Sequence, residues 1–109
     1  MKAYVIAQIR VEDPEIYSQY TAQTPPTIKA YGGKFLARAG QAETIEGETF
    51  NQRLVILEFP SKEAVNKWFN SPEYQSIKHL RTASSTGHLL VVEGSPEGFA
   101  PDANVVKSA

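Results

Sequence analysis

The residues Arg53-Leu54-Val55-Ile56-Leu57-Glu58-Phe59-Pro60-Ser61 decide the fold class of this chain. The side chains at 55, 57 and 59 are apolar and alternate with a second set at 54, 56 and 58, which is the period of a β-strand. Pro60 ends this strand, and Ser61 is a helix-capping residue. The helix that follows carries apolar residues at helical spacing: Ala64, Val65, Trp68 and Phe69. The stretch therefore predicts a strand that leads directly into an amphipathic helix.

The N-terminal part of the chain repeats this order. Tyr4–Val11 is predicted to be a strand, with odd-numbered residues on one side and even-numbered residues on the other. Asp13 then caps a helix whose first residue is Pro14, which has no N–H group to leave unpaired. Pro25-Pro26 is predicted to break or kink this helix, because proline removes a backbone hydrogen bond. Gly32-Gly33 is predicted to end the helical region.

Three further segments complete the pattern. A short strand is predicted at Lys34–Arg38, and residues 41–51 are predicted to form a hairpin arm or a long loop. A second helical piece is predicted from Pro72 to about Ser84, with Gly87 closing it before a last strand at His88–Glu93. The order strand, helix, strand, strand, helix, strand predicts an α+β fold of the ferredoxin-like βαββαβ type. Its sheet is antiparallel and both helical regions lie on one face.

Length and composition limit the classes of function. The chain has 109 residues, of which 41% are hydrophobic. We predict one domain over residues 1–94 and a loosely held extension over 95–109, anchored by Phe99 and Val105-Val106. The 11 Lys and Arg against 12 Asp and Glu leave no basic excess for nucleic acid or an anionic membrane. With no Cys, the chain has no disulfide, thiolate nucleophile or Cys-ligated metal. No signal-type or membrane-spanning segment is evident, so we predict a cytoplasmic protein.

The helices can cover only one face of a four-stranded sheet. The alternation puts four apolar residues on the other face: Tyr4, Ile6, Leu54 and Ile56. An apolar patch of that size is rarely left in water, so either a second copy of the chain or a ligand covers it. Pairing of two sheets face to face predicts a homodimer with a closed interior. Gln8, Arg10 and Glu58 would then line a pocket inside it.

Short motifs at the junctions between elements carry a further signal. They are Gly32-Gly33-Lys34-Phe35-Leu36-Ala37-Arg38, Glu58-Phe59-Pro60-Ser61, Trp68, Ser71-Pro72-Glu73-Tyr74 and Arg81. Together, over Lys2 to Gly94, they resemble the domain-of-unknown-function family 1330. The resemblance implies a homodimer of the dimeric α/β-barrel superfamily with a cleft between sheet and helices. It brings no known reaction, since that superfamily includes cofactor-independent monooxygenases, lactone isomerases, haem-handling enzymes and ligand-binding regulatory modules.

Arg38 and Glu58 are the first candidates for a ligand site. Each lies in or at the end of a predicted strand, and each would face a largely enclosed volume. A carboxylate that faces a guanidinium there is either a structural ion pair or an anion-binding site with a tuned acid. In the second case Arg38 would hold an anionic group through its bidentate fork, and Glu58 would move a proton.

Tyrosine and histidine side chains supply the other candidates. Tyr17 and Tyr20 lie on the inward stripe of the first helix, and Tyr74 and Arg81 share one face of the last helix. Tyr20 with Arg81 would steady a developing oxyanion, while Tyr17 and Tyr74 would contact the ligand. The alternative is that the tyrosines are core residues with one polar end. His88 is a second candidate to carry a proton.

No metal or cofactor site is predicted. His79 and His88 each lack a second His or carboxylate at ligand spacing. Gly32-Gly33 follows a helix rather than preceding one, so it does not form a phosphate-binding loop.

Three functions remain open at this stage. The first is an enzyme, of the oxygenase or isomerase-like kind, that acts on a small anionic or aromatic compound without a cofactor. The second is a non-catalytic ligand-binding or regulatory module that uses the same pocket. The third is a purely structural dimer whose interior is filled by side chains. The sequence names neither the ligand nor the reaction.

Overall fold

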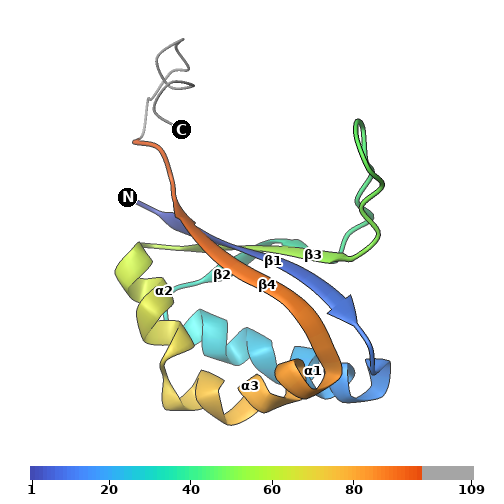
Figure 1. Ribbon diagram of the computed structural model, residues 1–109. Coiled ribbons are helices and arrows are strands. Elements are labelled where there is room, and N and C mark those ends of the chain that lie inside the picture. The colour runs from blue at the N-terminus through green and yellow to red at the C-terminus, as the bar shows by residue number, and fades with distance from the viewer. Residues whose placement is uncertain (97–109) are drawn as a thin grey trace.

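The computed structural model describes residues 1–96, which fold into four strands and three helices. In chain order they are β1 (Ala3–Val11), α1 (Pro14–Ala30), β2 (Lys34–Arg38), β3 (Arg53–Phe59), α2 (Lys62–Phe69), α3 (Pro72–Ser84) and β4 (Ser85–Glu93). The strands form one antiparallel sheet in the order β2-β3-β1-β4. All three helices lie on one face of it (Figure 1). The predicted α+β, ferredoxin-like class is confirmed.

The helices begin where capping residues predict that they begin. The side chains of Asp13, Ser61 and Ser71 each accept a hydrogen bond from the backbone N–H three residues later. Each of these bonds satisfies one of the donors that the first turn of a helix leaves free. The chain therefore turns from strand to helix at positions fixed by local chemistry.

Helix α1 continues through Pro25-Pro26, so the predicted break is absent. Neither proline has a backbone N–H, and the carbonyl groups of Thr21 and Ala22 therefore lack their usual donors four residues later. A side chain replaces one of these donors, because Nη2 of Arg38 donates to the Thr21 carbonyl at 2.8 Å. Tertiary contacts thus support a helix that its own sequence weakens.

The prediction that Gly87 closes the last helix is wrong. Strand β4 begins at Ser85, directly after α3, and Gly87 lies within the strand opposite Ile9 of β1. Its φ is +148°, and a Cβ at this position would overlap the backbone oxygen of Gln8. The glycine therefore serves the close approach of β1 and β4 rather than a helix exit.

The predicted alternation of β1 and β3 is confirmed. Odd-numbered residues face the helices and form the core: Ala3, Val5, Ala7, Ile9, Val55, Leu57 and Phe59. The apolar even-numbered residues face away from the helices and are half-buried: Tyr4, Ile6, Leu54 and Ile56. We call the surface that these four residues share the outer face of the sheet.

Two predicted segments lie outside this core. Residues 39–52 connect β2 to β3 and project away from the helices, in agreement with the predicted arm or loop (Figure 1). The predicted anchors Phe99 and Val105-Val106 lie outside the described residues. Within residues 1–96, no helix is long and apolar enough to cross a membrane. The cytoplasmic location stays a prediction.

Candidate functional site

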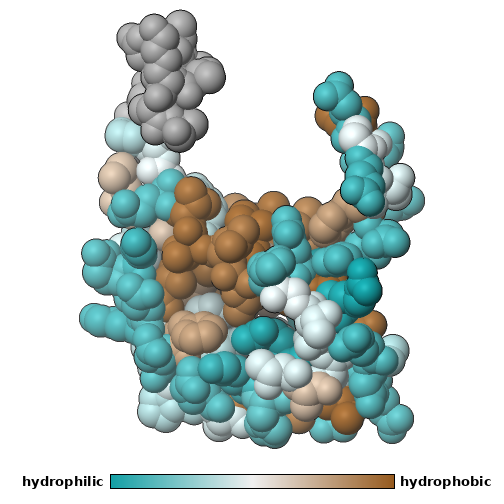
Figure 2. Space-filling model, viewed as in Figure 1, coloured by the Kyte–Doolittle hydropathy of each residue, from teal (hydrophilic) through white to brown (hydrophobic). Residues whose placement is uncertain are grey.

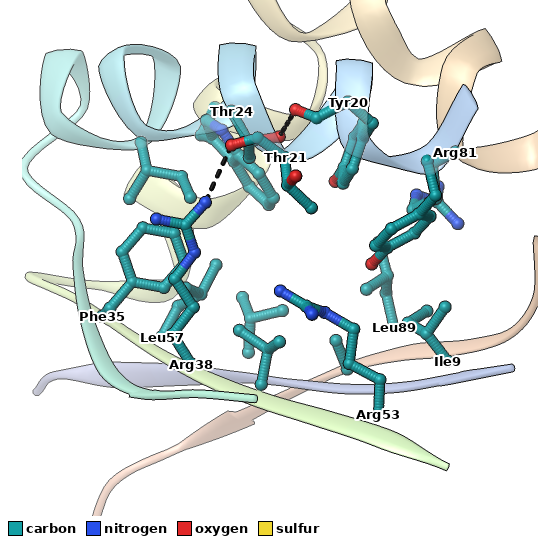
Figure 3. A pocket seen from close by; sticks show the side chains of 16 residues that line it. Ile9, Tyr20, Thr21, Thr24, Phe35, Arg38, Arg53, Leu57, Arg81 and Leu89 are labelled. Atoms are coloured by element: carbon teal, nitrogen blue, oxygen red, sulfur yellow. Dashed lines mark hydrogen bonds between the residues drawn. The ribbon is translucent and has the colours of Figure 1, made fainter. Parts of the chain in front are cut away.

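A pocket lies between the helix-facing side of the sheet and the helices (Figure 3). Its volume is about 40 Å³, and it opens to solvent. Its apolar walls are Val5, Ala7, Ile9, Ile28, Phe35, Val55, Leu57, Trp68 and Leu89. Its polar lining consists of Tyr17, Tyr20, Thr21, Thr24, Arg38, Arg53 and Arg81. Within residues 1–96, three guanidinium groups and no carboxylate line this pocket, so the charge of this lining is positive.

A β-bulge turns Arg38 toward the pocket. The pairing of β2 with β3 shifts register between Phe35 and Ala37. This extra residue places Arg38 opposite Val55, on the helix-facing side, where simple alternation from Phe35 would have put it on the outer face. Its guanidinium carbon lies 4.6 Å from the centroid of the Phe35 ring. With its bond to the Thr21 carbonyl, Arg38 is held in place before any ligand arrives.

Glu58 lies on the opposite face of the sheet from Arg38, so the predicted pair does not form. It contacts the ammonium groups of Lys2 at 3.6 Å and Lys34 at 3.2 Å. Desolvation raises the pKa of Glu58, but the two lysines outweigh it and hold the pKa below its ordinary value. A carboxylate held in this way is a weak base. His88 is exposed on the same outer side of the sheet. The structure therefore does not bring these two predicted proton carriers into the pocket.

Arg53 is the pocket residue that the sequence analysis missed. It begins β3, and its side chain points into the pocket (Figure 3). Its Nε is buried without a hydrogen-bond partner, and its guanidinium carbon lies 5.5 Å from the centroid of the Tyr17 ring. A buried donor without a hydrogen-bond partner lowers the free energy of unfolding by about 1–3 kcal/mol. The inward direction of Arg53 is predictable from the sequence, because Arg53 lies two residues before Val55 and four before Leu57 and so shares their face of the strand.

Tyr20, Tyr74 and Arg81 form a chain of hydrogen bonds beside the pocket. The hydroxyl oxygens of Tyr20 and Tyr74 lie 2.8 Å apart, and Nε of Arg81 donates to the Tyr74 hydroxyl at 3.1 Å. Either hydroxyl can be the donor in the Tyr20–Tyr74 bond, and Arg81 also donates to the Tyr74 oxygen. Tyr20 lines the pocket, so its hydroxyl is the member of this chain that a ligand can contact. Tyr74 itself does not line the pocket, which places it behind Tyr20.

Burial keeps the pocket phenols protonated. Desolvation, and after it the neighbouring Tyr74, raises the pKa of Tyr20. Desolvation also raises the pKa of Tyr17, although Arg53 and Arg81 oppose this shift. Both side chains are therefore hydrogen-bond donors at neutral pH. Protonated phenols beside guanidinium groups make a site that is rich in donors and suited to ligand oxygens.

A metal site is a separate question. In the part of the chain that the structure describes, no group of three or more His, Asp or Glu side chains is placed to hold a metal ion. The polar lining of the pocket is made of arginine, tyrosine and threonine instead.

The fold is similar to that of several solved structures. RPA0582, a protein of unknown function from Rhodopseudomonas palustris, has a TM-score of 0.71 at 19% identity, covering 87% of this chain and 83% of that chain. SnoaB from Streptomyces nogalater, described as a cofactor-independent oxygenase, has a TM-score of 0.63 at 14% identity, covering 89% and 96%. Rv0793 from Mycobacterium tuberculosis has a TM-score of 0.52 at 17% identity, covering 93% and 100%. At these identities the likeness shows the fold alone.

Comparison with protein families gives one match over most of the chain. The family described as "Domain of unknown function (DUF1330)" matches residues 2–95. No curated protein matches this sequence.

Proposed function

This chain belongs to the DUF1330 family, and we propose that the pocket between its sheet and its helices binds a small organic anion. One observation carries the proposal: among the residues that the structure describes, Arg38, Arg53 and Arg81 line the pocket and no carboxylate does. Like charges repel one another in a partly buried site, and a bound anion relieves that repulsion. The unpartnered Nε of Arg53 is a donor that a ligand oxygen would satisfy.

The proposed ligand carries a carboxylate on an apolar or aromatic body. Arginine binds carboxylates through two parallel hydrogen bonds, which gives Arg38 and Arg53 the role of holding the anion. Trp68 and the aliphatic walls offer apolar surface to the rest of the ligand. The Tyr20 hydroxyl, which lines the pocket, would bind a second oxygen, such as a carbonyl close to the acid. Arg81 acts on Tyr20 through Tyr74 and is therefore a positioning residue.

The chain contains its own reporter for this proposal. Trp68 is the one tryptophan of the sequence and lines the pocket, so its fluorescence should change when a ligand binds. Benzoate and its neutral isostere benzamide are suitable probes. We expect benzoate to bind at least about tenfold more tightly, because charge-assisted hydrogen bonds contribute about 1.5–3 kcal/mol. Arg53→Met should remove this preference, and Lys29→Met, at an exposed position of α1, should keep it. Equal binding of the two probes by the unmodified protein would refute the proposal.

A cofactor-independent reaction on the bound anion is the second candidate function. The arginines would bind a substrate that enters as its anion, having already lost its proton to water, and the Tyr20 hydroxyl would donate a hydrogen bond to an oxyanion that develops on it. The similarity in fold to SnoaB, described as a cofactor-independent oxygenase, adds support at the level of fold. Glu58 and His88 have no proposed role in this reaction, since both lie on the other side of the sheet.

Mass spectrometry distinguishes the two candidates. The protein is incubated in air with a panel of hydroxybenzoates and hydroxynaphthoates, and the mass of each compound is measured before and after. A compound that binds and changes mass, at a rate that Tyr20→Phe lowers at least about tenfold, supports catalysis. Compounds that bind and emerge unaltered assign the pocket to a non-catalytic ligand-binding or regulatory module.

We also propose that two copies of the chain pair through the outer face of the sheet. Besides the four residues that define this face, Leu90 and Val92 of β4 pair with Ile6 and Tyr4 and are each 53% exposed. Apolar surface of this extent is more typical of an interface than of a monomer. Sedimentation at micromolar concentration should show a dimer that Ile6→Lys dissociates, whereas Ala22→Lys on α1 should leave it intact. A monomeric unmodified protein would contradict the pairing.

A further inference from the structure

A second cavity lies on the helix side of the sheet, beside the edge strand β4. Its volume is about 280 Å³, and it opens to solvent. Its lining is mostly apolar and comes from β1, α2, α3 and β4: Val5, Val65, Asn66, Trp68, Phe69, Arg81, Leu89, Leu90 and Val91. We call this cavity the β4 groove. Figure 2 shows a hydrophobic area on the surface in the region of β4, next to hydrophilic helix residues.

The groove exists because the helices leave the inner side of β4 uncovered. Val5 of β1 and Leu57 of β3 face the helices and are 3% and 4% exposed. Val91 is paired with Val5 and faces the same side, yet it is 40% exposed. Because β4 is at the edge of the sheet, the helices that cover β1 and β3 stop short of it. An apolar strip of the inner sheet surface is therefore left open to solvent.

The β4 groove and the positively charged pocket are neighbours. Val5, Trp68, Arg81 and Leu89 line both cavities. A molecule whose acidic group lies among the arginines would therefore have apolar surface within reach on the far side of Trp68 and Leu89. In the described part of the chain, Arg81 is the one charged side chain that lines the groove, and its Nε is already bonded to Tyr74.

We propose that the ligand of this protein is an amphipathic anion, with its acidic group in the pocket and an apolar chain along the β4 groove. This inference rests on the proposed function of the pocket and adds the class of ligand. The occupant it names is a carboxylate with a hydrocarbon chain or an extended apolar ring system. The charge of the pocket fits the head of such a molecule, and the exposed strip that includes Val91 fits its tail.

The length of the ligand's hydrocarbon chain is the quantity that tests this inference. Burial of each further CH₂ group should tighten binding by up to about fourfold until the groove is filled. The probes are hexanoate, octanoate and decanoate, with benzoate as the short anion that needs the pocket alone. Trp68 fluorescence reports on both cavities, because this side chain lines both.

Adjacent valines on β4 give a matched pair of variants. Val91→Thr places a hydroxyl on the groove side, whereas Val92→Thr makes the same change on the outer face. We expect Val91→Thr to reduce the affinity gained from hexanoate to decanoate at least about threefold while benzoate binds as before. Val92→Thr should keep the full gain. Asn66→Leu, at an exposed groove position on α2, adds apolar surface and should steepen the gain.

The possible results separate this inference from the proposed function. Benzoate binding with no gain along the alkanoate series would overturn the amphipathic ligand and leave the anion pocket standing. The amphipathic ligand is also overturned if the gain survives Val91→Thr and is unchanged by Asn66→Leu. A lower sedimentation coefficient for Val91→Thr would assign the strip to a second copy of the chain instead. If neither benzoate nor any alkanoate binds, both proposals fail.

Discussion

Replacement of Arg53 by methionine should stabilise the protein and at the same time remove its affinity for carboxylates. Methionine keeps an unbranched apolar side chain but removes the guanidinium group. In the structure the Nε of this group is buried and has no hydrogen-bond partner among the described residues, while the group lies 5.5 Å from the Tyr17 ring. Burial raises the pKa of Tyr17, and the guanidinium group opposes this rise through its charge and a hydrogen bond. It also adds to the positive charge that Arg38 and Arg81 bring to the pocket. A residue kept for structure would show the opposite behaviour.

The magnitude follows from these contacts. The unpaired buried donor costs about 1–3 kcal/mol, and the contact with the aromatic ring returns about 0.5–1 kcal/mol. Arg53→Met should therefore raise the free energy of unfolding by about 0–2.5 kcal/mol. For a domain of about 100 residues, each kcal/mol raises the melting temperature by about 4–8 °C. Benzoate affinity should fall at least about tenfold in the same variant.

Arg38→Met is the matched control, because it makes the same chemical change at the other wall of the pocket. Arg38 donates to the Thr21 carbonyl, whose usual helical donor four residues later is missing because Pro25 lacks an N–H. Its loss should lower the free energy of unfolding by about 0.5–1.5 kcal/mol. Urea and thermal unfolding measure both variants. The reasoning is refuted if Arg53→Met is less stable than the unmodified protein by more than about 1 kcal/mol, or if it binds benzoate as before.

Three further predictions concern stability. Gly33→Ala should lower the free energy of unfolding by about 1–3 kcal/mol, because a Cβ there would lie 2.7 Å from buried side chains of α1 and β3. Gly40→Ala is the control, since a Cβ at that position has nothing within 4 Å. In the same urea titration it should be neutral or slightly stabilising. Because burial raises the pKa of Tyr20, the folded state keeps a proton that the unfolded chain loses near pH 10. The contribution of Tyr20 to the free energy of unfolding should thus be constant below about pH 9 and be lost above about pH 10, so the alkaline fall should be less steep in Tyr20→Phe; identical slopes would contradict this cause. Pro25→Ala restores an N–H for the Thr21 carbonyl, so Arg38→Met should lower the free energy of unfolding by less in the Pro25→Ala protein than in the unmodified one. A double-mutant cycle measures this difference. Purely additive effects would show that the two sites are independent.

The sequence predicts well those features that depend on residues close to one another along the chain. The strand alternation around Val55 and Leu57 and the caps at Asp13, Ser61 and Ser71 were all visible in this way. Each is set by backbone geometry within about four residues. The order of strands and helices followed from these local signals, and with it the fold class.

The errors occur where a distant segment decides the local structure. Pro25 does not break α1, and Gly87 belongs to β4 because of its contact with Gln8 on β1. Arg38 and Glu58 were expected to face each other, but the register shift in β2 separates them. Arg53 differs from these cases. Its inward direction follows from alternation alone, and what the sequence could not show is that its Nε is left without a partner.

Two irregularities of the backbone meet at Arg38, and together they explain why the two arginines differ. The bulge in β2 turns Arg38 inward, and Pro25 leaves the Thr21 carbonyl without a helical donor. Arg38 then donates a hydrogen bond to this carbonyl. Arg38 is consequently fixed before a ligand arrives, and a ligand meets it with little further loss of side-chain entropy. Arg53 has no such partner for its Nε. Hence Arg38 supplies a fixed direction for the anion, while Arg53 supplies a donor whose hydrogen bond is first made when the anion binds.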